Sequence, residues 1–288
     1  MSINLTRLLK LLSLYILLMI INTACVSFRE SDRKVLREFK KNSIKPEIYR
    51  ENYQGKTIRY ISTKPINISI PTILFIHGAP GSAGNYFEYL KDVELGKKAN
   101  LITLDRLGYG YSDFGKAETS LEKQAESIYT IAEKHKLTDL ILVGWSYGVP
   151  IAAKMAYKYP EVKHSVLVAG AISPEDEKFF GIAKMAHWKL TKWMVPKSLR
   201  IADEEKMTHV EELTNMLSDW NNIKTPITYY HGTKDKLVPY KNMAFITSKV
   251  NDSLLKAVTL KEANHFILFK KYDMVKKELL EVLNSLDD

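Results

Sequence analysis

A serine flanked by glycines is the first feature of the sequence whose residue types could carry out chemistry. The pentapeptide Gly144-Trp145-Ser146-Tyr147-Gly148 follows a short apolar run and precedes a segment with helical spacing. A serine in such a strand-to-helix turn has a strained backbone, and glycines two residues away let strand and helix approach closely. The sequence therefore predicts that Ser146 is a nucleophile.

A serine hydroxyl reacts at neutral pH only when a base takes its proton and a carboxylate orients that base. The best base is His265, which lies in Ala263-Asn264-His265-Phe266 after an expected strand at 254–260. The best carboxylate is Asp235, which follows an expected strand at 227–231. We therefore predict a catalytic triad of Ser146, Asp235 and His265.

Four motifs in a fixed order give the chain, from about Tyr60 to its end, a resemblance to the α/β hydrolases. They are His77-Gly78-Ala79-Pro80-Gly81, the segment from Asp105 to Ser112, the turn at Ser146, and the Asp235 loop followed by His265. The order serine, aspartate, histidine is also that of the triad in this family. The resemblance implies a mostly parallel, eight-stranded sheet with one early antiparallel strand, and a cap inserted between the sixth and seventh strands.

In that family the turn after His77 supplies the oxyanion hole. Because Pro80 has no N–H, the expected donors are the backbone amides of Ala79 and of Tyr147, the residue after the nucleophile. His77 itself, like His231, ends an expected strand just before a glycine, where a structural hydrogen bond is the favoured role. Asp105 is expected to brace its glycine-rich turn, and Asp176 is the rival of Asp235 as triad acid.

Short apolar runs alternate with helical segments over most of the chain, which predicts an α/β fold with helices on both faces of the sheet. The expected strands are 47–51, 57–63, 71–77, 101–105, 139–144, 164–170, 227–231 and 254–260. The expected helices are 85–97, 120–135, 147–159, 239–250 and 267–286. With 45% hydrophobic residues in 288, the chain can bury a large core, and its single cysteine excludes an intrachain disulfide.

Residues 174–224 interrupt this alternation and are expected to form a helical cap over a core made of 47–173 and 225–288. Such an insertion follows the carboxyl end of a strand, where open α/β sheets bind ligands. Trp145, Trp188 and Trp193 are the candidate pocket residues. The alternative is that the aromatic residues of the insertion only pack it onto the core.

The amino terminus has the three-part layout of a secretory signal. Arg7 and Lys10 precede an apolar run from Leu11 to Ile21, and small or polar residues lead to Cys25. The ending resembles the lipobox of bacterial lipoproteins, although Asn22 replaces the usual aliphatic residue. We expect a signal peptide at 1–24, lipidation of Cys25 and a basic tether at 25–46. The alternative is an uncleaved transmembrane anchor, for which an eleven-residue run, apolar except at Ser13, is short.

The formal net charge of +9 is concentrated near the amino terminus. Between Arg29 and Lys64, eleven Lys or Arg face five Asp or Glu, which favours an anionic membrane surface as partner. The chain contains no recognisable nucleic-acid recognition fold, so nucleic acid is not an expected partner. These features predict a membrane-anchored lipoprotein of the bacterial cell envelope that faces outside the cytoplasm.

The predicted activity is hydrolysis of a small-molecule ester through an acyl-enzyme, with no cofactor and no metal. A serine in the turn, in place of an aspartate, argues against epoxide hydrolases and haloalkane dehalogenases. The first alternative is a proline iminopeptidase, because the segment 77–81 resembles the H-G-G-P-G of that family, although the turn at Ser146 departs from its usual G-G-S-W-G. In that alternative, cap glutamates would bind a substrate amine; the candidates are Glu204, Glu205, Glu211 and Glu212. The second alternative is a non-catalytic ligand-binding protein on a hydrolase scaffold.

Overall fold

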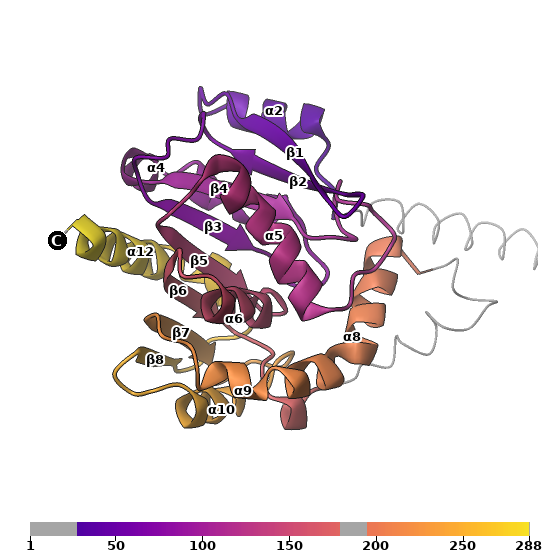
Figure 1. The fold of residues 1–288 in the computed structure, drawn as a ribbon, viewed down its shortest axis with the longest axis vertical. Coiled ribbons are helices and arrows are strands. Elements are labelled where there is room, and N and C mark those ends of the chain that lie inside the picture. The colour runs from indigo at the N-terminus through magenta and orange to yellow at the C-terminus, as the bar shows by residue number, and fades with distance from the viewer. Residues whose placement is uncertain (1–27, 179–194, 288) are drawn as a thin grey trace, which may run out of the picture.

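The computed structural model describes residues 28–178 and 195–287, and an eight-stranded sheet lies at its centre (Figure 1). The strands are β1 (Glu47–Tyr53), β2 (Lys56–Ser62), β3 (Thr72–Ile76), β4 (Asn100–Asp105), β5 (Leu140–Trp145), β6 (Val162–Val168), β7 (Ile227–Gly232) and β8 (Leu255–Leu260). Their order across the sheet is β1-β2-β4-β3-β5-β6-β7-β8. All eight overlap the strands that the sequence predicts.

The early antiparallel strand is β2. It pairs antiparallel with β1 on one side and with β4 on the other, and the remaining pairs from β4 to β8 are parallel. The carboxyl ends of β3 to β8 therefore meet at one edge of the sheet, which is the edge where ligands bind in open α/β folds. The sheet expected from the sequence is confirmed.

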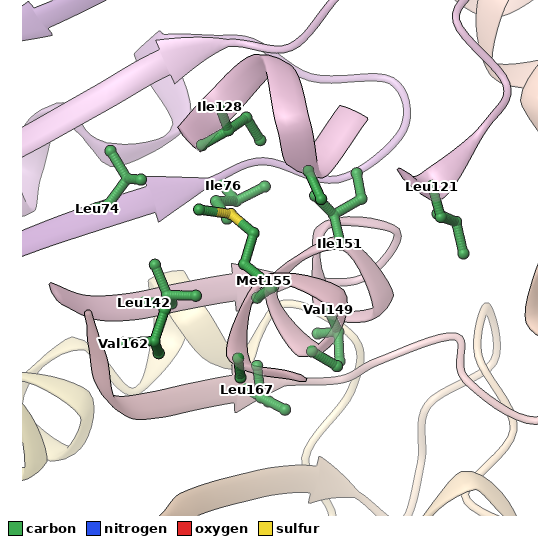
Figure 2. Packing of buried hydrophobic residues seen from close by; sticks show 14 of the residues in the cluster. Leu74, Ile76, Leu121, Ile128, Leu142, Val149, Ile151, Met155, Val162 and Leu167 are labelled. Carbon is green, nitrogen blue, oxygen red and sulfur yellow. The ribbon is translucent and has the colours of Figure 1, made fainter. Parts of the chain in front are cut away.

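Both faces of the sheet are buried, because the central strands are apolar on both sides. In β3, Leu74 and Ile76 point into one core cluster while Ile73 and Phe75 point into the other. Successive side chains of a strand face opposite ways, so a continuous apolar run must be covered twice. Figure 2 shows the first cluster, in which Leu74, Ile76 and Leu142 of the sheet lie near Met155 of α6.

Helices cover each of these faces. The first cluster contains residues of α5 (Leu121–His135), α6 (Gly148–Lys158), α9 (Leu217–Trp220) and α10 (Asn242–Lys249). The second contains residues of α2 (Asp32–Lys40), α3 (Phe87–Leu90), α4 (Val93–Lys98), α11 (Ile267–Lys270) and α12 (Tyr272–Asp287). The sheet is thus the middle layer of three.

Helix α2 lies within the range for which the sequence predicts a tether. Ser31 caps its first turn by accepting a hydrogen bond from Lys34 N, and Val35 and Phe39, one turn apart, are fully buried in the second cluster. The phenyl ring of Phe39 meets that of Phe87 edge to face. This part of the range belongs to the folded domain, so a tether would be restricted to the residues before it.

Two helices predicted as continuous are interrupted. The expected helix at 85–97 is a 3-10 turn η1 (Ala83–Tyr86) followed by α3 and α4. The cause is Asp92, whose carboxylate accepts hydrogen bonds from Glu94 N and Leu95 N and so starts α4 afresh. The expected helix at 267–286 is likewise divided into α11 and α12 at Lys271.

The described part of the insertion consists of the short turn η2 (Pro174–Asp176), α8 (Lys197–Asn215) and α9. Figure 1 shows α8 on the side toward which the arrowheads of β3 and β5 point. Trp220 of α9 is fully buried in the first core cluster, edge to face with Phe245. That tryptophan packs the insertion onto the core, as the structural alternative for its aromatic residues predicts.

No helix within residues 28–178 and 195–287 is long and apolar enough to cross a membrane. The predicted signal peptide, Cys25, Trp188 and Trp193 lie outside the described residues.

Candidate active site

Ser146 lies in a strained turn between β5 and α6. Its φ is 55°, in the left-handed region that residues with a Cβ rarely adopt, and its N–H donates to Val168 O. The turn closes because Gly148 has no side chain: a Cβ there would lie 2.3 Å from Ile76 O. A Cβ on Gly144 would similarly lie 2.8 Å from Gly148 O. The two glycines therefore have the close-approach role that the sequence predicts for them.

Asp235 and His265 form a direct pair. Their loops follow β7 and β8, and His265 Nδ1 lies 2.7 Å from Asp235 Oδ2. The second carboxylate oxygen accepts hydrogen bonds of 2.9 Å from both Leu237 N and Val238 N. Burial raises the pKa of Asp235, but the hydrogen bond and charge of His265 outweigh it, so the net result is a lowered pKa. Asp235 is therefore an ionised, fixed acceptor for the imidazole.

A cavity of about 300 Å³ contains both Ser146 and His265. No hydrogen bond joins these two side chains among the described residues, although such contacts commonly tighten only when substrate binds. Ala79 and Tyr147 line the same cavity, as expected of oxyanion donors. Two larger hollows, of about 540 and 680 Å³, contain no residue of the predicted triad. The smaller cavity is therefore the candidate active site.

Trp145 was expected in the substrate pocket, but it is not among the residues that line this cavity. Its side chain points into the second core cluster, because residues next to each other on a strand face opposite sides of the sheet. The indole N–H donates to His265 O at 3.1 Å, and the two rings lie 5.3 Å apart. Trp145 thus supports the loop that carries His265.

Buried Asp105 and Arg106 support the loop that carries Ala79, the predicted oxyanion donor. Asp105 accepts hydrogen bonds from Ala83 N, Tyr111 N and Arg59, which is the bracing role expected for it. Burial raises the pKa of Asp105, against the opposing effect of Arg59. Arg106 donates to His77 O and Gly78 O, so it fixes the backbone immediately before Ala79.

Arg106 also joins the loop to the cap. Glu205 of α8 accepts from two nitrogens of its guanidinium, at 2.6 and 3.2 Å, and from Tyr109 Oη at 2.6 Å. Arg106 and Glu205 are both fully buried. The guanidinium lies 4.8 Å from the ring centroids of both Tyr109 and Tyr147. The buried Arg106–Glu205 ion pair therefore connects the cap helix to the loop before Ala79 and to Tyr147, the two predicted contributors to the oxyanion hole.

None of the four glutamates considered for amine binding lines the cavity. Glu205 is engaged by Arg106, and Glu212 accepts a hydrogen bond from Leu121 N. Glu204 and Glu211 are exposed. The cap instead contributes other polar residues to the cavity: Glu177, Asp203, Lys206 and His209.

The remaining candidates lie apart from the Asp235–His265 pair or support it. Asp176, the rival acid, accepts from Ser173 Oγ and is paired with Lys241. His77 Nε2 accepts from Arg106 N, and burial lowers the pKa of His77. His231 contacts Tyr229 Oη and Val238 O and lies 3.6 Å from Asp235 Oδ2. Both histidines have the structural hydrogen bonds that the sequence favours.

Reasoning from the sequence missed Arg106 and His209. Arg106 stands beside a residue that the sequence does single out, but its partner Glu205 is 99 positions away. His209 lies on the cavity face of α8 with Leu199, Asp203 and Lys206. That spacing of three and four is visible in the sequence, yet a polar helical stripe normally indicates a solvated face. In the described ranges no group of three or more His, Cys, Asp or Glu could hold a metal ion.

Comparisons with known proteins identify the fold. Residues 71–194 match the family model described as the alpha/beta hydrolase fold. A crystal structure of MGS-M2, an alpha/beta hydrolase enzyme from a Medee basin deep-sea metagenome library, superposes with a TM-score of 0.65 at 19% identity, covering 82% of this chain and 97% of that one. The chain therefore has the α/β-hydrolase fold.

Curated relatives are similar over part of their length. A 1-acylglycerol-3-phosphate O-acyltransferase of Arabidopsis thaliana is 36% identical over 143 residues, which are 46% of this chain and 34% of the relative. A proline iminopeptidase of Lactobacillus helveticus is 27% identical over 158 residues, 54% of this chain and 50% of the relative. The chain thus spans about a third to a half of the length of these relatives.

Proposed function

We propose that the chain is a serine hydrolase that cleaves a small-molecule carboxylic ester. The observation that carries the proposal is the Asp235–His265 pair, which opens into the same cavity as a serine held at positive φ. In this mechanism Ser146 Oγ attacks the ester carbonyl while His265 Nε2 takes its proton. The amides of Ala79 and Tyr147 stabilise the oxyanion.

Collapse of the tetrahedral intermediate expels the alcohol, which receives the proton from His265, and leaves an acyl group on Ser146. Water, deprotonated by the same imidazole, then attacks the acyl carbon, and the imidazolium returns the proton to Ser146 Oγ as the acid is released. Asp235 accepts the hydrogen bond from Nδ1–H of His265 throughout and stabilises the imidazolium. Every proton moves between Ser146, His265, substrate and water, so the described residues need no cofactor for this sequence.

Fluorophosphonate labelling tests the proposal, because the reagent forms an adduct only with an activated serine. We expect rapid labelling of the wild type and none of Ser146→Ala or His265→Ala. Ser248→Ala, which removes an exposed serine of α10, is the matched control and should label like wild type. Equal labelling of all four proteins would refute the assignment and favour the binding-protein alternative.

The proline iminopeptidase is the second candidate function, favoured by the relative of that name. Against it stands the cavity, which contains none of the four glutamates expected to bind a substrate amine. Lys206 also lies in the cavity and forms an ion pair with Glu177 there, so it offsets the charge of one of the two cavity carboxylates, Glu177 and Asp203. Turnover of proline-naphthylamide without turnover of short p-nitrophenyl esters would reverse the order of these candidates.

We also propose that the protein is anchored at an anionic membrane surface of the bacterial envelope through lipidation of Cys25. The support is the sequence: an apolar run before the cysteine and an excess of basic residues after it. Incorporation of radiolabelled palmitate that is lost in Cys25→Ala is the expected result. Membrane retention of a full-length, unlipidated chain would favour a transmembrane anchor in its place.

A further inference from the structure

The cap brings a second histidine–carboxylate pair into the candidate active site. His209 of α8 lines the cavity that contains Ser146 and His265, and it is only 1% exposed. Its Nδ1 lies 2.9 Å from Glu177 Oε1, and Glu177 in turn forms an ion pair with Lys206. Glu177, Lys206 and His209 thus form a connected polar group on the cap side of the cavity.

The hydrogen bond to Glu177 fixes the tautomer of His209. A carboxylate can only accept, so Nδ1 carries the hydrogen and Nε2 presents a lone pair. Burial lowers the pKa of His209, which keeps the imidazole neutral near pH 7. Nε2 is therefore an acceptor in the resting protein.

That acceptor has no hydrogen-bond partner among the described residues, although it is buried. Buried polar atoms without a partner are uncommon and unfavourable, and they often mark sites where a ligand or water completes the hydrogen bonding. The imidazole stacks on the ring of Tyr147, with centroids 4.5 Å apart and an angle of 29° between planes. The orphaned acceptor is therefore held against the residue whose backbone amide is a predicted oxyanion donor.

We propose that His209 Nε2 accepts a hydrogen bond from the substrate and so selects esters that carry a hydroxyl or amide N–H close to the carbonyl. The inference rests on the proposed function and names the substrate class for the same site. The side chains of Leu199, Ala202 and Val238 in the cavity wall cannot make this hydrogen bond, and the carboxylates of Glu177 and Asp203 already have interactions of their own. Selection for a donor is therefore assigned to the unpartnered Nε2 of His209, which simple aliphatic esters would leave unpaired.

The test uses the full-length protein and compares pairs of esters in which one member carries a hydroxyl and the other has a hydrogen or a methyl group in its place. One pair, p-nitrophenyl 3-hydroxybutyrate against p-nitrophenyl butyrate, probes the acyl side, and 2-hydroxyethyl butyrate against propyl butyrate probes the alcohol side. We expect the wild type to prefer the hydroxylated member of at least one pair by about 2- to 10-fold in kcat/KM, the effect of one neutral hydrogen bond.

Two variants of His209 and one control separate the hydrogen bond from packing. His209→Phe keeps a ring against Tyr147 but has no acceptor, so the preference should vanish. His209→Gln retains an acceptor and should retain part of it. Leu199→Ala alters the cavity wall without touching the hydrogen bond, so it should change both members of a pair equally.

Binding to Ser146→Ala, measured by calorimetry with the same esters, gives a readout that does not need turnover. A hydroxyl preference that disappears in Ser146→Ala/His209→Phe supports the inference even if the wild type hydrolyses none of these esters, which would count against the proposed function alone. No preference in either pair, or a preference unchanged in His209→Phe, would overturn the inference. A preference unchanged in His209→Phe would mean that another group, or an ordered water, accepts the hydrogen bond from the hydroxyl.

Discussion

Removing the carboxylate of Glu205 should destabilise the protein far more than an ordinary substitution. Arg106 is fully buried, and in Glu205→Ala its guanidinium would keep only the hydrogen bonds to His77 O and Gly78 O. Two charge-assisted hydrogen bonds and the counter-charge would be lost together. Breaking a buried ion pair by deleting one partner costs about 3–5 kcal/mol, and we expect a loss of that size in the free energy of unfolding.

The double variant Arg106→Met/Glu205→Leu is the informative control. It removes both charges and fills the space with apolar side chains, so no uncompensated charge stays buried. We expect it to be more stable than Glu205→Ala by at least about 2 kcal/mol, given that buried pairs are often replaceable at little cost. Tyr109 would still lose its acceptor, and His77 O and Gly78 O would lose a donor, which sets a limit to the recovery.

Urea unfolding followed by circular dichroism at pH 7 measures these differences, and kcat/KM on p-nitrophenyl butyrate measures their effect on the site. Glu205→Ala should also lower kcat, because Arg106 then holds the loop before Ala79 without its link to the cap. A loss of stability below about 1 kcal/mol, or a double variant as unstable as Glu205→Ala, would refute the reasoning that the ion pair connects cap and loop.

Three further outcomes are expected. Asp235→Asn should lower kcat about 10³- to 10⁴-fold with little effect on urea unfolding, because the imidazole loses its orienting carboxylate; a loss below tenfold would contradict that role. Gly148→Ala should cost at least 1–3 kcal/mol of unfolding free energy, since a Cβ would lie 2.3 Å from Ile76 O, and unchanged stability would refute the close approach. Burial lowers the pKa of His164 from 6.5 to about 4, so the unfolded chain binds more protons between these values and stability falls as pH drops from 6.5 towards 4, by up to about 3 kcal/mol. Between pH 7 and pH 5, urea unfolding should show a smaller loss of unfolding free energy in His164→Gln than in the wild type. Equal losses in the two proteins would argue against this role of His164.

The sheet could be predicted because its strands carry a strong local signal. Runs such as 72–76 are apolar at every position, and a strand that is buried on both faces needs that pattern whatever surrounds it. Helix boundaries depend on individual side-chain hydrogen bonds, which the apolar pattern does not reveal. One carboxylate, that of Asp92, caps a new helix and divides a segment whose apolar spacing alone favours a single helix. Helix α2 was missed for a different reason: its nine residues are mostly charged, and only two of them are buried.

In the candidate site, too, residues with a local sequence signal could be predicted and residues that depend on distant contacts could not. Ser146, Asp235 and His265 could be named because each follows a strand in a motif with its own chemistry. The cap side could not, since the roles of Glu205 and His209 come from residues that meet only in three dimensions: Arg106 for the first, Tyr147 and Glu177 for the second. A glutamate and a histidine on a helix rich in charged residues give no local sign of burial.

The strand-end loops and the cap form different sides of the cavity, and we expect them to contribute differently to reactivity and to substrate selectivity. The residues of the predicted triad and the predicted oxyanion amides belong to loops at the ends of strands, which the close-packed sheet holds in place. The cap contributes the polar groups on the other side of the cavity, and it is joined to the catalytic loops through Arg106–Glu205 and the stacking of His209 on Tyr147. Substitutions in α8 that spare these two contacts should therefore alter which ester is accepted while leaving fluorophosphonate reactivity intact. Substitutions that break the ion pair should reduce both ester turnover and fluorophosphonate reactivity.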